Sequence, residues 1–226
     1  MDESFKVKRL TRLYESCNRC GLPVLTCICK IVSPINTKAK FWIIASKREL
    51  YRPSSTGRLL KLINPNSTEI FLWERTHPSL KLLENIANHR GKTYLVFPAE
   101  SEELAAKTVN KVEEGAGAFI LIDGTWKEAR RIFRKSDYLK DLPLVSLKPA
   151  CESKFSLRRG SVEGTLCTIE AAMEILKLTD EIEQEQIMGE YFNVFLKHFK
   201  AGVSSHLPRD YVSSTFNFEE DYGDKS

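Results

Sequence analysis

The alternation of short apolar runs with amphipathic helical stretches is the feature that most constrains this fold. The sequence predicts strands at 39–46, 68–73, 93–97, 117–122 and 143–147. Between and after them it predicts helices at 57–64, 78–89, 101–114, 125–135, 165–178 and 180–201. Strands that alternate with helices pair in parallel, because each helix carries the chain back across the sheet. We therefore predict an α/β fold, a mostly parallel sheet with helices on both faces.

Four of the six cysteines lie within thirteen residues, in the string CNRCGLPVLTCIC. Cys17 and Cys20 form a C-x-x-C pair, and Cys27 and Cys29 form a C-x-C pair. Four thiolates in tetrahedral geometry are typical of structural zinc and leave no open position for chemistry. Free thiols, a redox C-x-x-C or an iron–sulfur cluster are the alternatives, although the second pair has no use in a redox motif. We predict that these four cysteines bind Zn²⁺.

Composition and segment boundaries suggest an ordinary globular chain in three parts. We expect an N-terminal segment with the four-cysteine motif at 1–36, a main domain at 37–203, and a polar tail at 204–226. The apolar runs are strand-sized, and the N-terminus has no apolar core of the kind that secretory signals carry. We therefore expect a cytoplasmic protein that does not contact a membrane. The formal net charge of +4 is only a mild basic excess.

Polar segments follow several predicted strands, where ligands bind in parallel α/β folds. They are RPSSTGR at 52–58, FPAES at 97–101, DGTW at 123–126 and the loop at 148–165. None is a G-x-G-x-x-G motif or a P-loop, which disfavours a dinucleotide site or an NTPase. Asp123 has two interpretations from its position alone. It caps the helix that follows, or it faces the ligand cleft as a general base.

A run of positive charge follows the DGTW segment along the predicted helix and into the next loop. Such a run is either a solvated helix face or a surface that binds phosphate backbones. The residues are Lys127, Arg130, Arg131, Arg134, Lys135, Arg158 and Arg159.

Four separated blocks occur in one order along the chain: CNRCGLPVLTCIC, YRPSSTGRLL, LIDGTWKEARRIFRKS and SLRRGSVEGTLCTIEAA. Together they resemble the DTW-domain family over roughly residues 15–200. The size resembles that of the bacterial members, tRNA-uridine aminocarboxypropyltransferases. These transfer the 3-amino-3-carboxypropyl group of S-adenosylmethionine to N3 of a uridine in tRNA and release 5′-methylthioadenosine. One departure is Cys167, where family members usually carry Ser before the Thr of the last block.

The resemblance also implies a fold and a set of site residues. The family is related to the SPOUT class, in which a trefoil knot forms the cofactor pocket. Asp123 then becomes the favoured base for uridine N3. The positions implied for S-adenosylmethionine are Phe97, Pro98, Ala99, Ile122, Gly124, Thr125, Trp126, Leu147, Leu166, Cys167 and Thr168, with Ser55 and Thr56 for its amino-acid end or the target base. Arg52 and Arg58 join the basic residues above as implied contacts to tRNA.

Two other functions stay open at this point. A SPOUT-type RNA methyltransferase would use the same donor but release S-adenosylhomocysteine. A non-catalytic zinc-ribbon module would bind RNA without responding to the donor. The sequence leaves the oligomeric state open.

Overall fold

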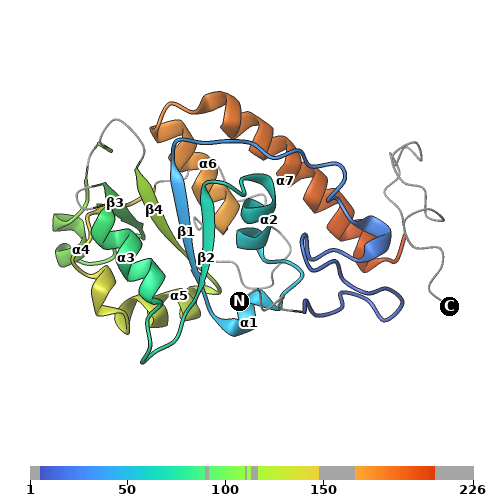
Figure 1. The fold of residues 1–226 in the computed structure, drawn as a ribbon, viewed down its shortest axis with the longest axis horizontal. Helices are drawn as coiled ribbons and strands as arrows, with labels where there is room; N and C mark the ends of the chain where they lie inside the picture. Colours follow the sequence, from blue (N-terminus) through green and yellow to red (C-terminus); the bar gives the residue numbers. More distant parts are fainter. Residues whose placement is uncertain (1–5, 90–91, 110, 113–116, 148–165, 207–226) are drawn as a thin grey trace.

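A computed structural model of the chain describes residues 6–89, 92–109, 111–112, 117–147 and 166–206. These residues form one five-stranded sheet in the order β2-β1-β4-β3-β5, and every pair of neighbouring strands is parallel (Figure 1). The α/β fold with a parallel sheet is therefore confirmed. The strands are β1 (Lys40–Ala45), β2 (Thr68–Leu72), β3 (Thr93–Val96), β4 (Ala118–Asp123) and β5 (Leu144–Val145).

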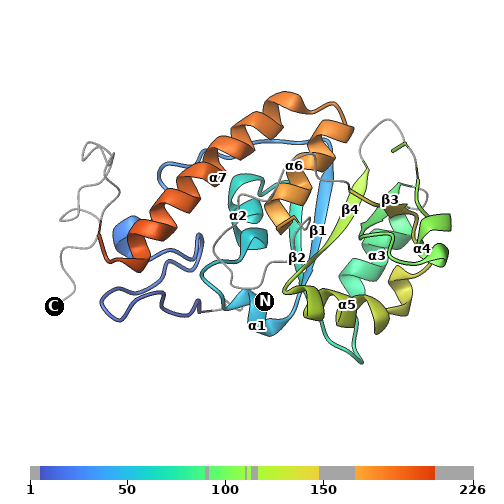
Figure 2. The same ribbon diagram turned by 180° about the vertical axis from the view of Figure 1, so that it is seen from behind.

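Helices cover both faces of the sheet, as the sequence predicts (Figures 1 and 2). Helices α2, α6 and α7 pack on one face, and α3 and α5 pack on the other. The helices are α1 (Lys47–Leu50), α2 (Thr56–Ile63), α3 (Leu80–Asn88), α4 (Glu102–Ala106), α5 (Trp126–Arg134), α6 (Thr168–Leu178) and α7 (Ile182–Val203), with 3-10 turns at Val24–Thr26 and Asp137–Leu139.

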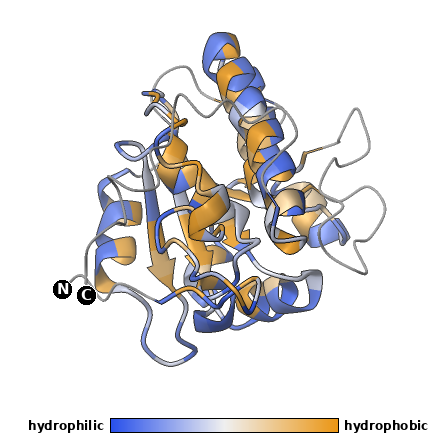
Figure 3. Ribbon diagram, turned by 90° about the vertical axis from the view of Figure 1, so that its right-hand side faces the viewer, coloured by the Kyte–Doolittle hydropathy of each residue, from blue (hydrophilic) through white to orange (hydrophobic). Residues whose placement is uncertain are grey.

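The side chains of β1 point alternately to the two faces of the sheet and pack in two different hydrophobic cores. In β1, Phe41 and Ile43 face the core under α2, α6 and α7, whereas Trp42 and Ile44 face the core under α3 and α5. All four side chains are buried. Burial on both faces explains why this strand is a continuous apolar run rather than an alternating one. The apolar colour of the strands between the helices shows the same arrangement (Figure 3).

One predicted helix is too long. The sequence predicts a helix over 101–114, but α4 ends at Ala106. Beyond it the backbone pairs with β5: Leu144 N–H donates to Lys107 O and Val109 N–H donates to Leu144 O, each at 2.9 Å. Thr108 and Val109 are β-branched and favour extended backbone, so edge pairing outweighs continuation of the helix.

The N-terminal segment is packed into the main core. Cys20, Leu22 and Ile28 are fully buried in the same cluster as α2, α6 and α7. A Cβ on Gly202, near the end of α7, would lie 2.8 Å from Thr26 Oγ1, so only glycine allows this close approach. The segment therefore shares its core with the domain that follows.

The connection from β5 to α6 bears on the predicted knot. Residues 148–165 lie outside the described residues, so the SPOUT-like knot stays a prediction. No described helix is long and apolar enough to cross a membrane.

Candidate active site and metal centre

Asp123 is the last residue of β4 and is only 3% exposed. Its carboxylate accepts two hydrogen bonds from hydroxyl groups, one from Thr168 Oγ1 to Oδ1 at 2.6 Å and one from Ser55 Oγ to Oδ2 at 2.9 Å. Ser55 is the N-cap of α2 and Thr168 is the first residue of α6. The carboxylate therefore lies where two helix N-termini meet, a location that stabilises negative charge.

The structure removes the capping interpretation of Asp123. The N-cap of α5 is Thr125, whose hydroxyl accepts from Glu128 N–H, while the Glu128 carboxylate accepts from Thr125 N–H at 2.9 Å. Burial acts to raise the pKa of Glu128, but its hydrogen bonds from Thr125 and the charge of Arg52 outweigh burial and lower that pKa. Because this capping box is complete, Asp123 is not needed to cap α5.

Gly57 allows α2 to approach the carboxylate closely. A Cβ at this position would lie 2.8 Å from Asp123 Oδ2 and 3.2 Å from Ile43 Cγ2. The glycine in the RPSSTGR segment is thus required by packing against Asp123. Nothing in the local sequence pattern shows that contact, because the two residues are far apart along the chain.

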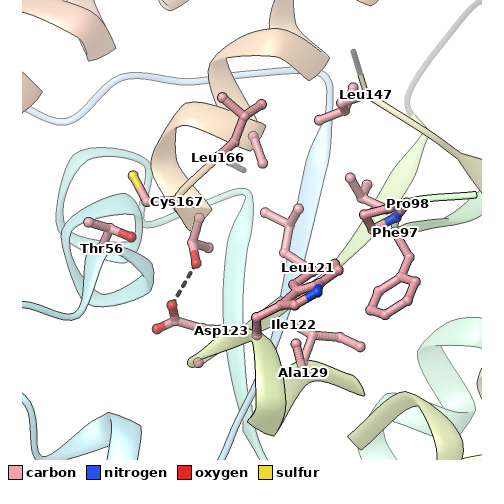
Figure 4. A pocket seen from close by; sticks show the side chains of 15 residues that line it. Thr56, Phe97, Pro98, Leu121, Ile122, Asp123, Ala129, Leu147, Leu166 and Cys167 are labelled. Atoms are coloured by element: carbon pink, nitrogen blue, oxygen red, sulfur yellow. Dashed lines mark hydrogen bonds between the residues drawn. The ribbon is translucent and has the colours of Figure 1, made fainter. Parts of the chain in front are cut away.

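A cavity of about 140 Å³ borders Asp123 at the carboxyl ends of β3 and β4 (Figure 4). Thr56 and Cys167 lie on one side, Phe97 and Pro98 on the other, and Asp123 at the base. Ten of the positions implied for the donor line this cavity: Thr56, Phe97, Pro98, Ile122, Gly124, Trp126, Leu147, Leu166, Cys167 and Thr168. Ser55, Ala99 and Thr125 are not among the described lining residues.

Four lining residues were missed by the sequence reasoning. Ala129 follows Trp126 by three positions and Ala171 follows Thr168 by three, so each shares a helix face with a predicted residue. Val96 and Leu121 are the strand neighbours of predicted positions. Helical periodicity could have found the two alanines. Whether Val96 and Leu121 point toward the cavity depends on which face of the sheet the cavity occupies, and the local sequence does not show this.

Aromatic rings form one wall of the cavity. Phe97 stacks between Trp126 and Phe133, with ring centroids 5.4 Å and 4.8 Å away. The Arg130 guanidinium lies 5.2 Å from the centre of the Trp126 ring and pairs with Glu100 at 2.8 Å. Trp126 therefore anchors α5 to the sheet and lines the cavity at the same time.

Cys167 occupies the position where the family usually carries a serine. It is the N-cap of α6, and its N–H donates to Glu170 Oε2 at 2.9 Å. Burial raises the pKa of the Cys167 thiol well above its usual value, so the thiol stays neutral. The α6 hydroxyl that reaches the Asp123 carboxylate belongs to the neighbouring Thr168.

We expect Thr168→Val to destabilise the protein by about 1.5–3 kcal/mol, because it removes a buried hydrogen bond to a charged group. Thr168 is 9% exposed and its hydroxyl is 2.6 Å from Asp123 Oδ1. Thr168→Ser keeps the hydroxyl and is the matched control. Denaturant unfolding measures both changes. Equal stability of the valine and serine variants would show that this bond contributes nothing.

The four clustered cysteines form a group whose sulfur atoms all lie within 4.8 Å of one another. The distances from Cys17 Sγ to Cys29 Sγ and from Cys20 Sγ to Cys27 Sγ are both 3.7 Å. Disulfide sulfurs are about 2.05 Å apart, so these are free thiols. A tetrahedral zinc site with Zn–S bonds of about 2.3 Å requires sulfur–sulfur distances of about 3.8 Å. The donor set and its spacing therefore fit Zn²⁺.

The structure places the two arginines of the RPSSTGR segment in contacts within the protein. Arg58 is partly buried, which lowers its pKa, and it donates to Asn18 O at 2.9 Å and to Leu50 O. Arg52 pairs with buried Glu49 at 2.5 Å and lies 3.7 Å from Glu128. Asn18 lies between Cys17 and Cys20, so Arg58 connects α2 to the cysteine cluster.

The basic residues of α5 lie at the surface. Arg131 lies over the ring of Trp73, with its guanidinium carbon 5.6 Å from the ring centroid. The exposed cations on or next to this helix are Lys127, Arg130, Arg131, Arg134 and Lys135. Arg158 and Arg159 lie outside the described residues.

Fold and site together define an α/β protein with a cavity that borders the Asp123 carboxylate at the carboxyl ends of the strands, and with a four-cysteine cluster packed against the main core. The sequence matches the DTW domain over residues 14–200, and the chain belongs to this family. It is 24% identical to tRNA-uridine aminocarboxypropyltransferase 2 of Drosophila melanogaster, over 92% of this chain and 85% of that protein. The protein of the same name in Mus musculus is 25% identical, over 87% of this chain and 67% of that protein. No solved structure matches.

Proposed function

We propose that this chain is a tRNA-uridine aminocarboxypropyltransferase that uses S-adenosylmethionine as donor. The observation that carries the proposal is the position of the D-G-T-W segment, which places Asp123 and Trp126 in the wall of one cavity. Membership of the DTW family and the likeness to two transferases of that name over most of the chain support it. The methyltransferase and the non-catalytic binder have no comparable support.

S-adenosylmethionine would supply a γ-carbon activated by its sulfonium, and the uridine N3–carbon bond forms as the carbon–sulfur bond breaks. Uridine N3 carries a proton at neutral pH, so the reaction needs a proton acceptor. We assign this role to Asp123. Each of its oxygens accepts one hydroxyl hydrogen bond and keeps a further lone pair. Ser55 and Thr168 orient the carboxylate, and the convergence of α2 and α6 keeps it in place.

The walls of the cavity suit a donor with an adenine ring and a sulfonium. Phe97 and Trp126 offer aromatic surface, and an aromatic face attracts a cation. Leu121, Ile122 and Leu147 exclude water, which strengthens electrostatic interactions with Asp123. We propose that the ten lining positions implied by the family bind the donor. The SPOUT-like knot is part of this proposal.

The cysteine cluster would hold Zn²⁺ as a structural ion. Four thiolate ligands leave no open position, and the cluster packs against Arg58 of α2 rather than in the wall of the cavity. Its role in the proposed enzyme is to hold the described residues of the N-terminal segment against the main domain. We also propose, as the sequence predicts, that residues 204–226 form a polar tail separate from the main domain.

Transfer RNA would approach along α5, whose exposed cations follow directly after the D-G-T-W segment. Lysine and arginine side chains bind phosphate backbones without regard to sequence. Arg130 lies over Trp126, which lines the cavity, so its guanidinium group is held beside the cavity. Arg131, on the same helix, lies over Trp73.

The test is to incubate the protein with S-adenosylmethionine and unmodified tRNA, and to analyse the nucleosides and small products by mass spectrometry. We expect 3-amino-3-carboxypropyl-uridine and an equal amount of 5′-methylthioadenosine. Formation of S-adenosylhomocysteine with a methylated nucleoside would replace this proposal by the methyltransferase. RNA binding with no donor consumption would replace it by the non-catalytic module.

A further inference from the structure

The N-terminal segment and α1 expose a group of positive side chains, all of which except Arg19 lie outside the family motifs. The acidic residues of 6–20 and 46–52 are Glu15, which pairs with Arg9, and Glu49, which is buried and pairs with Arg52. The remaining exposed cations make no ion pair with another described residue. They are Lys6, Lys8, Arg12, Arg19, Lys47 and Arg48.

Backbone and side-chain contacts connect these cations to the edge of the sheet where the cavity lies. Lys8 N–H donates to Tyr51 O at 2.9 Å, which fixes the N-terminal segment against the end of α1. Nη1 of the next residue, Arg52, lies 3.7 Å from Oε2 of Glu128 on α5. Figures 1 and 2 both show α1 and α5 along this same edge.

The surface is hollowed where the N-terminal segment meets α1. An open depression of about 370 Å³ is lined by Lys6, Val7, Lys8, Arg9, Glu15 and Tyr51. Three of these side chains are cationic and one is aromatic. Phosphodiester backbones with unstacked bases are bound by this combination, because cations neutralise phosphates and aromatic rings stack on bases.

We propose that Lys6, Lys8, Arg9, Lys47 and Arg48 form a second surface for the phosphate backbone of the RNA substrate, which we call the cationic N-terminal face. It rests on the proposed function, and it extends the RNA contact from α5 across α1 to the cysteine segment. The Arg52–Glu128 contact joins the residue after α1 to α5, so the cations of α5 and of this face belong to neighbouring elements. An RNA that delivers one base to the cavity would then meet positive charge on both elements.

The contacts of Arg52 and Arg58 explain why other residues are needed here. Both arginines occur in a family motif and are expected to meet RNA, but their guanidinium groups bind Glu49 and backbone carbonyls. Arg48 and Lys8 are exposed at the same edge. The cationic N-terminal face therefore supplies RNA with the positive charge that Arg52 and Arg58 cannot offer, because these two arginines contact other groups of the protein.

The test variant is Lys8→Glu with Arg48→Glu in the full chain. The matched control is Lys38→Glu with Lys92→Glu, which changes charge equally at exposed residues that precede β1 and β3, on the opposite edge of the sheet. Binding of unmodified tRNA is measured by titration from low to physiological salt. S-adenosylmethionine binding and thermal unfolding are measured in parallel.

We expect the test variant to bind tRNA at least about tenfold more weakly at low salt. The slope of its log affinity against log salt concentration should be shallower by the equivalent of about one to two phosphate contacts. The control should bind like wild type, and both should bind the donor normally. If charge reversal destabilises the protein, Lys8→Gln with Arg48→Gln removes the charges without adding repulsion. Equal tRNA affinity of the test and control variants would overturn the proposal.

The same experiment separates this inference from the proposed function. If wild type modifies tRNA and the test and control variants bind it equally, the proposed cationic N-terminal face is wrong and the proposed transferase activity is retained. If wild type modifies no tRNA but the test variant binds RNA more weakly than the control, the transferase activity is wrong and the proposed RNA-binding face is retained.

Discussion

Replacement of Asp123 by asparagine should reduce turnover by about 10²–10⁴-fold, which is the usual contribution of a general base. Asparagine has nearly the shape of aspartate, and its side chain can still hydrogen-bond to the hydroxyls of Ser55 and Thr168. It cannot accept the N3 proton. Stability and binding of both substrates should therefore change little. Single-turnover modification of tRNA at saturating donor measures the chemical step directly.

The control for this variant is Thr168→Ser, which keeps the hydroxyl bonded to the carboxylate and leaves Asp123 intact. It should retain most of the activity, whereas Asp123→Asn should not. Equal single-turnover rates for Asp123→Asn and wild type would remove Asp123 from proton transfer. Its two hydroxyl partners would then make it a residue that joins α2 and α6 to β4.

Loss of metal from the cysteine cluster should unfold much of the protein. Zinc in small zinc-binding peptides binds with roughly 10–16 kcal/mol, and that free energy also stabilises the fold. Cys20 is fully buried and belongs to the main core, so the cluster is continuous with it. We expect about one zinc per chain in the purified protein. Cys20→Ser should lower the free energy of unfolding by several kcal/mol.

Cys167→Ser is the matched control, because Cys167 is a free thiol outside the cluster. It should keep its zinc and unfold near the wild-type temperature. Elemental analysis and thermal unfolding, with and without a chelator, distinguish the two variants without any activity measurement. Stable protein that contains no metal would contradict the assignment.

Much of the fold was predictable because its signals are local. The apolar run of β1 and the separation of strands by helices indicated a parallel sheet covered on both faces. The helix predicted beyond Ala106 was wrong, because pairing with Leu144 is a contact between distant parts of the chain. Local propensity cannot describe such a contact, and here edge pairing outweighed it.

The site was predictable to a similar degree. Lining residues such as Phe97, Gly124 and Thr168 follow strands or begin helices at the ligand-binding edge, and the family motifs mark those positions. The environments of Ser55 and Arg58 were not predictable, because motif membership does not reveal which way a side chain points. Ser55 supports the carboxylate, and Arg58 donates to backbone carbonyls.

By itself, the sequence determined the class of the sheet, the group of four thiols and a carboxylate at the end of a strand, because each follows from residues close together in the chain. Only the tertiary structure decided what surrounds that carboxylate. Its hydroxyl partners are 68 and 45 residues away, and they meet it because α2 and α6 pack on the same face of the sheet. Packing of buried apolar faces sets such meetings, and local sequence patterns carry no record of them.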